Sequence, residues 1–289
     1  MIKKLIKRIL KKPYIKFRNW KDEKKYNQKY ESKVLLDKKY TVIRGSIRGN
    51  DDYDDAWLLY LSNKCQIVFD IGCNIGQSSI LISHSKLLKK LFLVEPNPLS
   101  LSMASENLIL NNLSDNVTFI PKAAYNKSNE KIRLWTMPGA YAGASIDINF
   151  SESGKITNNF FEVETITLDD IAKTHNYNPD LVKIDVEGAE YSVLEGATNI
   201  AKNRHTIFLV EVHSSPDLSI EENTSKILNW TENNNYQAFY LSKHTHLKNL
   251  EDIKGRGRYH LLLIHKEKEY PEGLNKIKQA AKIEELNLN

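Results

Sequence analysis

Two short apolar segments of the 289-residue chain end in residues that can move protons or bind cations. The segment "LVKIDVEG" ends with Asp185 and Glu187, and the segment "FLVEVH" ends with Glu211 and His213. Both have the composition of buried strands, in which residues two apart share a face. If the strands are neighbours, the four side chains meet at one sheet edge. They then form a general base with orienting partners or a divalent-cation site, or Glu211 and His213 form a hydrogen-bonded pair that closes the sheet end.

A second group of residues surrounds a glycine-containing turn in "VFDIGCNIG". Asp70, Gly72 and Gly76 form the pattern D-x-G-x-x-x-G after a strand-like segment. This pattern matches neither dinucleotide sites nor phosphate loops, and Asp70 would repel a phosphate. S-adenosylmethionine fits better, because it carries an ammonium and a sulfonium group and no phosphate. Glu95 follows Asp70 by 25 residues at the next strand end, where a carboxylate can accept hydrogen bonds from both ribose hydroxyls.

These residues need a sheet to hold them, and the sequence from residue 65 onward alternates strands with helices. Near-continuous apolar strands separated by helices are typical of a parallel sheet covered on both faces. We expect strands over 66–72, 91–96, 117–125, 131–137, 162–168, 181–188, 207–213, 237–243 and 259–267. We expect helices over about 76–87, 98–111, 189–201 and 221–234, and a short one within 54–63. The last two strands have no clear helix between them, which favours one antiparallel strand. The stretch 125–165 breaks this alternation, which indicates a small insertion or an active-site loop.

Four motifs give the chain a specific resemblance. The segment "LVKIDVEGAEYSVLEGA", together with "VFDIGCNIGQSS", "VEPNP" and "ITLDDI", resembles the FkbM-type methyltransferases over about residues 65–265. The resemblance implies an α/β, Rossmann-like class I methyltransferase fold with a mostly parallel central sheet and helices on both faces. It implies S-adenosyl-L-methionine as the cofactor. It also implies O-methylation of a hydroxyl on a small acceptor, without selecting among sugars, polyketides and others. We expect a sugar or a glycan precursor, because such an acceptor suits a cytoplasmic enzyme that contacts the membrane.

The resemblance also assigns roles to residues. It implies that the cofactor is bound by Asp70, Gly72, Asn74, Gly76, Glu95, Lys122, Ala124 and Asp185. The first four would line the methionine part, Glu95 would hold the ribose, and the segment around Lys122 and Ala124 would pass near the adenine. Asp185 and Glu187 would lie beside the transferred methyl group. With the strand-end cluster, the expected catalytic residues are Asp185, Glu187, His213 and Glu211, and no residue is assigned to a metal.

Two charged residues near this cluster need partners. Lys183 lies inside an otherwise apolar strand, where burial of an unpaired ammonium would be costly. We therefore expect a buried ion pair with Asp70 or Asp185. Glu190 falls in the first turn of an expected helix, where a carboxylate favours the positive end of the helix dipole, so we expect a structural role.

The net charge of +5 is unevenly distributed. Residues 1–33 hold 13 Lys/Arg and 3 Asp/Glu, and the remainder holds 28 Lys/Arg and 33 Asp/Glu. Residues 2–12 have the pattern of a basic amphipathic helix, which favours either a peripheral membrane contact or a solvated terminal helix. No apolar run approaches the roughly 20 residues that span a bilayer, and two cysteines without a CxxC partner suit a reducing cytoplasm. We expect a cytoplasmic protein, with contact at the inner face of the membrane left open.

We expect four regions: a basic arm at 1–33, a helical lead-in at 34–64, the methyltransferase domain at 65–268 and a helical tail at 269–289. The main alternative is an RNA or protein methyltransferase that uses the arm for its partner, although the acidic body disfavours nucleic acid. A binding module that keeps the cofactor fold but catalyses nothing is disfavoured by the carboxylates Asp70 and Glu95. A nicotinamide enzyme is disfavoured because the pattern G-x-G-x-x-G is missing. A divalent metal is compatible with the strand-end cluster but not favoured, because no closely spaced ligand pair marks a metal site.

Overall fold

The computed structural model describes residues 28–48, 54–136, 144–145, 160–215, 218–255 and 257–286. The amphipathic helix predicted at residues 2–12 lies outside the described residues. In the described part of the chain, no helix is both long enough and apolar enough to cross a membrane.

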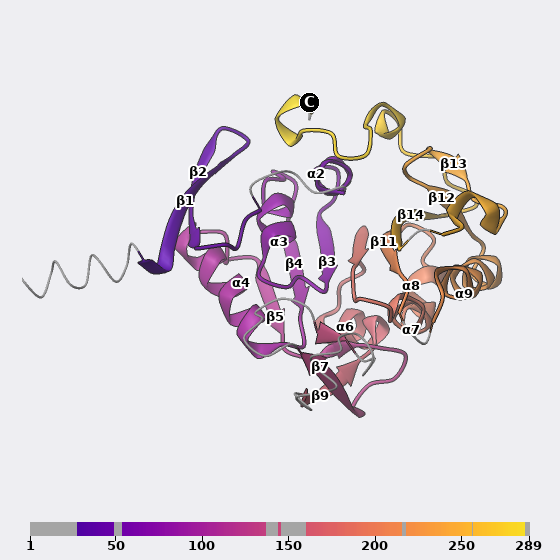
Figure 1. The fold of residues 1–289 in the computed structure, drawn as a ribbon, viewed down its shortest axis with the longest axis horizontal. Helices are drawn as coiled ribbons and strands as arrows, with labels where there is room; N and C mark the ends of the chain where they lie inside the picture. The colour runs from indigo at the N-terminus through magenta and orange to yellow at the C-terminus, as the bar shows by residue number, and fades with distance from the viewer. Residues whose placement is uncertain are drawn as a thin grey trace, which may run out of the picture.

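An eight-stranded sheet forms the centre of the molecule (Figure 1). Its strand order is β13-β12-β14-β11-β10-β3-β4-β5. The strands are β3 (Ile67–Ile71), β4 (Lys90–Val94), β5 (Val117–Ile120), β10 (Leu181–Ile184), β11 (Ile207–His213), β12 (Tyr236–Tyr240), β13 (Thr245–His246) and β14 (Arg258–His265). Strands β5, β4, β3, β10 and β11 pair in parallel, whereas β14 runs antiparallel to β11 and to β12. The predictions of a mostly parallel sheet and of an antiparallel strand near its end are confirmed.

Helices cover both faces of this sheet, as expected for strands that are apolar throughout. One face is covered by α2 (Asp55–Ser62), α3 (Gln77–Ile82) and α4 (Pro98–Leu110). The other is covered by α6 (Leu168–His175), α7 (Glu190–Glu195), α8 (Thr198–Lys202) and α9 (Ile220–Asn233). A buried apolar core lies on each face of the sheet. Adjacent residues of β3 belong to different cores, since Val68 packs against the first set of helices and Phe69 against the second.

Two helical segments differ from the prediction. The helix expected over 189–201 is divided into α7 and α8 near Gly196, where a Cβ would lie 2.3 Å from the carbonyl oxygen of Tyr125. Helix α6 begins inside the "ITLDDI" motif, where we expected no helix. The hydroxyl of Thr167 accepts a hydrogen bond from the N–H of Asp170, which is a favourable N-cap.

A smaller sheet of order β6-β9-β7-β8 occupies the stretch predicted as an insertion. It consists of β6 (Ala123–Ala124), β7 (Lys131–Thr136), β8 (Ala144–Ser145) and β9 (Phe160–Ile166). Residues 137–143 and 146–159 of this stretch lie outside the described residues. Strands β7 and β9 are antiparallel, and Ile132 and Leu134 of β7 line a pocket at the end of the main sheet.

Both ends of the described chain differ from the expectation. Residues expected to form the basic arm and the helical lead-in contain a hairpin of β1 (Tyr30–Leu35) and β2 (Lys38–Ile43). The side chains of Asn107 in α4 and of Asn111, which follows α4, bond the backbone of β2. In place of the helical tail, residues 269–286 hold 3₁₀ turns at Leu274–Lys276 and Ile283–Glu285. Side-chain contacts from distant parts of the chain thus decide the structure of both ends.

Candidate active site

A pocket opens at the carboxyl ends of β3, β4 and β10, where ligands bind in open α/β sheets. We call it the first pocket. Its empty space, which includes open solvent, is about 750 Å³. Apolar side chains of Val94, Ile132 and Leu134 form part of its wall, and Glu95 contributes a carboxylate. A pocket that combines apolar side chains with a fixed carboxylate is suited to a nucleoside-like ligand.

A second pocket adjoins the first, with an empty space, open solvent included, of about 800 Å³. It is lined by more charged residues than the first, among them Arg48, Asp54, Lys183 and Glu211. The two pockets share three lining residues, Gly72, Asn74 and Asp185. A ligand that fills the first pocket can therefore present one end to the second at this junction.

The turn between β3 and α3 brings bare backbone to the junction, as the glycine pattern predicts. Gly72 has a φ of 76°, and a Cβ at this position would lie 1.8 Å from the carbonyl oxygen of Asp185. Asn74 also has left-handed backbone, with a φ of 49°. Only glycine allows the ends of β3 and β10 to approach this closely.

Asp70 and Gly76 support the turn from within the protein. The Asp70 carboxylate is fully buried, and its Oδ2 accepts hydrogen bonds from the hydroxyls of Ser78 and Ser79 at 2.7 and 2.8 Å. A Cβ on Gly76 would lie 3.0 Å from Ala104 of α4, so this glycine lets the two helices pack. Neither Asp70 nor Gly76 is among the described residues that line the two pockets. Their predicted contact with the cofactor stays a prediction.

Lys183 has the buried partners that the sequence predicts. Its Nζ lies 3.1 Å from Oδ2 of Asp185 and 3.8 Å from Oδ1 of Asp70. Burial would lower the pKa of this ammonium, but the charges of Asp185, Asp70 and Asp54 outweigh burial and raise the pKa above its usual range. Lys183 is therefore a fixed positive charge beneath the junction.

Glu95 is held at the wall of the first pocket by two backbone groups. Its Oε2 accepts the N–H of Asn74 at 3.0 Å, and its Oε1 accepts the N–H of Asn97 at 2.8 Å. Burial raises the pKa of Glu95 to about 7, although both hydrogen bonds favour the ionised form. Each carboxylate oxygen keeps a lone pair that a ribose hydroxyl can use.

The two residues expected near the adenine lie in different places. Ala124 lines the first pocket. Lys122 is not among the lining residues, and its Nζ instead lies 3.0 Å from Oε2 of Glu164 in β9. The chain around Ala124 therefore borders the first pocket, whereas the side chain of Lys122 lies outside the pocket and is paired with Glu164.

The four residues expected to be catalytic come together. Nε2 of His213 lies 4.0 Å from Oδ1 of Asp185, 3.7 Å from Oε2 of Glu187 and 3.6 Å from Oε1 of Glu211. Strand β10 already ends at Ile184, and Glu187 lies in a turn with a φ of 53°. A turn, rather than strand alternation, therefore brings Glu187 to the cluster.

Glu190 orients the imidazole of His213. Its Oε1 lies 2.9 Å from Nδ1 of His213, and its Oε2 accepts a hydrogen bond from the amide of Asn223 at 2.8 Å. Burial would lower the pKa of His213, but the hydrogen bond to Glu190 and the charges of Glu190, Asp185 and Glu187 raise it to about 9. At neutral pH the imidazole thus keeps its second proton. Glu190 is more than the helix-dipole partner that we expected.

Residues 70–238, more than half of the chain, match the family model of the methyltransferase FkbM domain. The chain belongs to the FkbM methyltransferase family. With the strand order of the central sheet, this membership confirms the predicted Rossmann-like class I methyltransferase fold.

Individual proteins and solved structures also resemble the chain. The hexuronic acid methyltransferase AglP of Haloferax volcanii is 29% identical over 175 residues, which are 59% of this chain and 65% of AglP. The chain thus spans less than two thirds of that relative. The crystal structure of methyltransferase FkbM from Methylobacillus flagellatus KT is 19% identical, covering 74% of this chain and 48% of that chain with a TM-score of 0.46. M. jannaschii TYW2 in complex with AdoMet is 15% identical, covering 82% of this chain and 84% of that chain with a TM-score of 0.44.

Some polar residues of this FkbM-family protein had no sequence signal strong enough to assign them to the site. Asp54 precedes a short helix, and His260 interrupts the apolar strand "YHLLLIH". The antiparallel register of β11 and β14 places His260 opposite Glu211 and Arg258 opposite His213. Among the described residues, two sets of side chains lie close enough to hold a metal ion: Asp185, Glu211 and His213, and Asp54, Glu211 and His260.

Proposed function

We propose that this protein is an S-adenosylmethionine-dependent methyltransferase that methylates a hydroxyl oxygen of a sugar or a related small molecule. The observation that carries the proposal is the junction at Asp185. There, a pocket suited to a nucleoside meets a polar pocket beside a cluster of carboxylates and a histidine.

The proposed position of the cofactor follows the lining of the first pocket. The adenine would lie beside Ala124, Ile132 and Leu134, and the ribose hydroxyls would donate to Glu95. The methionine part would cross the bare backbone at Gly72, which leaves the sulfonium methyl near Asp185. The side chain of Asp70 would act indirectly, by holding the serines of the turn.

Methyl transfer is an in-line displacement, and most of the rate comes from positioning, because the sulfonium already activates the methyl group. The acceptor oxygen forms a bond to the methyl carbon while the carbon–sulfur bond breaks and S-adenosylhomocysteine leaves. The hydroxyl proton goes to a nearby base. At neutral pH His213 already holds two protons, so we assign Asp185 as that base and His213 as a cation beside it.

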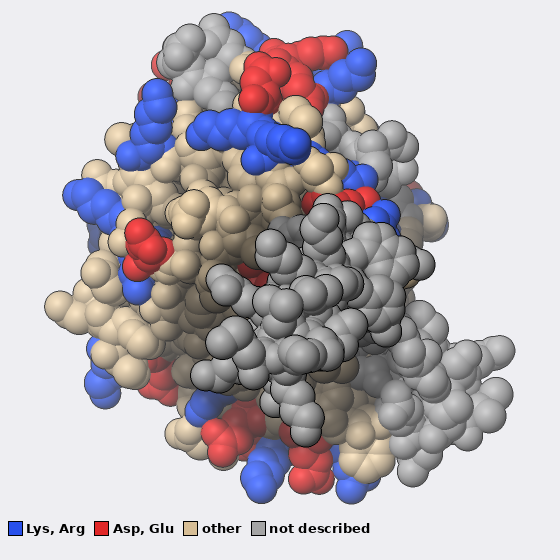
Figure 2. Space-filling view, turned by 90° about the vertical axis from the view of Figure 1, so that its left-hand side faces the viewer, with Lys and Arg blue, Asp and Glu red and all other residues tan. Residues whose placement is uncertain are grey.

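The choice of a sugar acceptor is supported by the name of the relative, a hexuronic acid methyltransferase, and by the polar lining of the second pocket. The described residues on the face seen in Figure 2 give no support to nucleic acid as the substrate. On the side with α4 and the β1–β2 hairpin, basic and acidic side chains are interspersed around a large uncharged area (Figure 2). Beside the hairpin strands, Nζ of Lys29 lies 2.5 Å from Oε1 of Glu106, and Nη1 of Arg44 lies 3.8 Å from Oε2 of Glu31. Contact of residues 2–12 with a membrane stays a separate proposal.

A methyl-transfer assay with labelled S-adenosylmethionine tests this function. Neutral sugars, uronic acids and unmodified RNA serve as acceptors, and the Asp185→Asn protein serves as the control. We expect label in a sugar and little label with Asp185→Asn. Mild alkali then distinguishes an ether, which survives, from a methyl ester of a uronic acid, which is hydrolysed. Label in RNA alone, or only as an ester, would contradict the proposal.

A further inference from the structure

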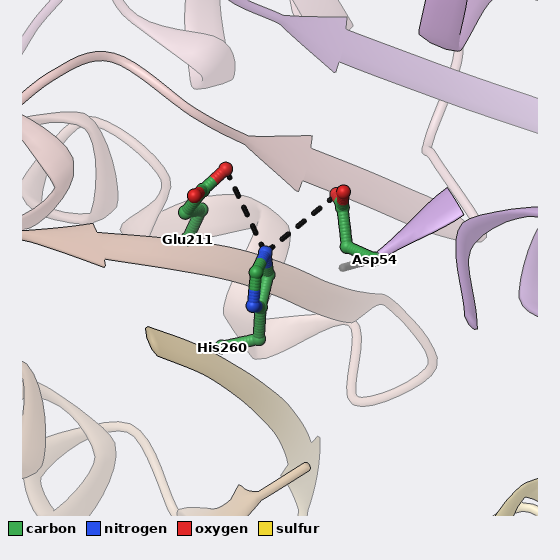
Figure 3. A group of neighbouring side chains, drawn as sticks. All are labelled: Asp54, Glu211 and His260. Carbon is green, nitrogen blue, oxygen red and sulfur yellow. Dashed lines mark ion pairs between the residues drawn. The ribbon is translucent and has the colours of Figure 1, made fainter. Parts of the chain in front are cut away.

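A group of three buried ionisable side chains lies beside the proposed acceptor site (Figure 3). Asp54 precedes α2, Glu211 comes from β11 and His260 comes from β14. Nε2 of His260 lies 3.6 Å from Oε2 of Glu211 and 3.8 Å from Oδ2 of Asp54. All three ligand atoms lie within 4.8 Å of one another.

The imidazole of His260 has no hydrogen-bond partner among the described residues. The residue is 3% exposed, and both ring nitrogens are buried without a partner. An unsatisfied polar group in a protein interior is costly, and such groups usually bind something. Figure 3 shows that Nε2 is directed between the two carboxylates.

The separations of these atoms suit a shared ion better than hydrogen bonds. At 3.6 and 3.8 Å, both contacts of Nε2 exceed hydrogen-bond length. Two ligands bound to one cation at about 2.0–2.2 Å lie about 3–4 Å apart when their bonds diverge. The Asp54 carboxylate also forms no cap on α2, although aspartate is a favoured N-cap residue, because it is directed to His260 instead.

The neighbouring group with His213 is less suited to an ion. Arg258 lies 3.0 Å from Oε1 of Glu211 on that side, and its positive charge opposes a cation there. The other oxygen of the carboxylate, Oε2, is directed toward His260.

We propose that Asp54, Glu211 and His260 bind one divalent cation that accepts both oxygen and imidazole ligands, with Mn²⁺ as the reference ion. Asp54 and Glu211 line the second pocket, so oxygens of water or of the acceptor complete the coordination. Resting on the proposed function, the cation would bind neighbouring hydroxyls of a sugar and ease the loss of a proton from the one that is methylated.

The first test measures Mn²⁺ binding to the full-length protein after EDTA treatment and gel filtration. Calorimetry should show one tight site per chain. Pulsed electron paramagnetic resonance of the bound Mn²⁺ should show a coupling to one imidazole nitrogen, a readout that needs no variant. Absence of a stoichiometric site, or a site without nitrogen coupling, would overturn the proposal.

Variants locate the ion. His260→Gln and Asp54→Asn should each raise the Kd for Mn²⁺ by at least about 100-fold, because changes outside the ligand set alone cost 10- to 100-fold. The matched control is His265→Gln, which replaces another buried histidine of β14 and should leave Mn²⁺ affinity unchanged. His213→Gln should also retain binding, and if it alone abolishes binding, the ion belongs to the other group. Circular dichroism checks the folding of each variant.

Separate measurements keep this inference distinct from the proposed function. S-adenosylmethionine binding is measured by calorimetry in EDTA, and methyl transfer is measured with and without Mn²⁺. If no Mn²⁺ site is found, and cofactor binding and sugar methylation proceed fully in EDTA, the metal proposal is wrong and the proposed function stands. A nitrogen-coupled Mn²⁺ site in a protein that does not bind the cofactor would end the proposed function alone.

Discussion

The two pockets differ in how they are built. In the first, the carboxylate of Glu95 is held by backbone groups of the turns that follow β3 and β4, at Asn74 and Asn97. The second takes charged side chains from segments as far apart as Arg48 and Glu211. Backbone hydrogen bonds therefore fix the carboxylate of the proposed cofactor site, and long-range ion pairs prepare the proposed acceptor site. Changes in the first should act on folding and cofactor affinity, and changes in the second on turnover and on the response to pH.

The largest effect should come from Gly72→Ala, at the junction of the two pockets. The new Cβ would lie 1.8 Å from the carbonyl oxygen of Asp185, so the ends of β3 and β10 must separate. We expect a loss of more than about 4 kcal/mol in unfolding free energy, measured by urea denaturation, together with loss of cofactor binding. The matched control is Gly255→Ala, which has a similar φ of 70° but nothing within 4 Å of the new Cβ. It should cost only about 1–2 kcal/mol, and equal losses would show that backbone conformation alone matters at Gly72.

Asp185→Asn should separate chemistry from cofactor binding. Removal of a general base costs typically about 10²–10⁴-fold in rate, so kcat should fall on that scale. The Kd for S-adenosylmethionine should change little, because Asn keeps the shape of the side chain and Lys183 retains Asp70 as a partner. Kinetics and calorimetry on the same preparation check both values. Wild-type turnover in both this variant and His213→Ala would place the chemistry elsewhere, with residues 135–160 as the first region to examine.

His213 should make stability depend on pH. Its folded pKa of about 9 lies above the ordinary value of about 6.5, so its protonation stabilises the folded state fully below pH 6.5. This contribution, about 3 kcal/mol, is lost as the pH rises to 9. Urea denaturation at pH 6 and pH 9.5 should show a larger loss for the wild type than for His213→Gln. Identical losses in the two proteins would mean that the imidazole does not carry this charge.

The smallest effect concerns Glu95 in the first pocket. Glu95→Gln should weaken S-adenosylmethionine binding by about 1.5–3 kcal/mol, the usual contribution of hydrogen bonds to a charged group. In the wild type, affinity should also fall as the pH drops below 7, because protonation of Glu95 removes an acceptor. Calorimetry across pH measures both effects. Lys122→Ala is the control and should not change the affinity, since Lys122 is paired with Glu164. If Lys122→Ala lowers the affinity as much as Glu95→Gln does, Lys122 contacts the cofactor and its assignment to the outside of the pocket is wrong.

The sequence alone determined the parallel core of the sheet and the position of the turn at its end. Apolar runs such as Ile67–Ile71 and a glycine pattern are local properties, so they can be read without knowing what they pack against. The ion pair of Lys183 was also predictable, because a buried ammonium requires a carboxylate. The proximity of Asp185, Glu211 and His213 was also predictable, since the carboxyl ends of parallel strands meet at one edge of the sheet.

The tertiary structure decided what depends on register and on distant partners. Only the pairing of β14 with β11 places His260 opposite Glu211, and no local pattern specifies the register of an antiparallel strand that arrives 45 residues later. The same holds for Asp70, whose side chain is buried beneath the turn, and for Lys122, whose ammonium is drawn outward to Glu164. A residue's type fixes which contacts it can make, but which side chain reaches a pocket depends on contacts between segments far apart in the sequence.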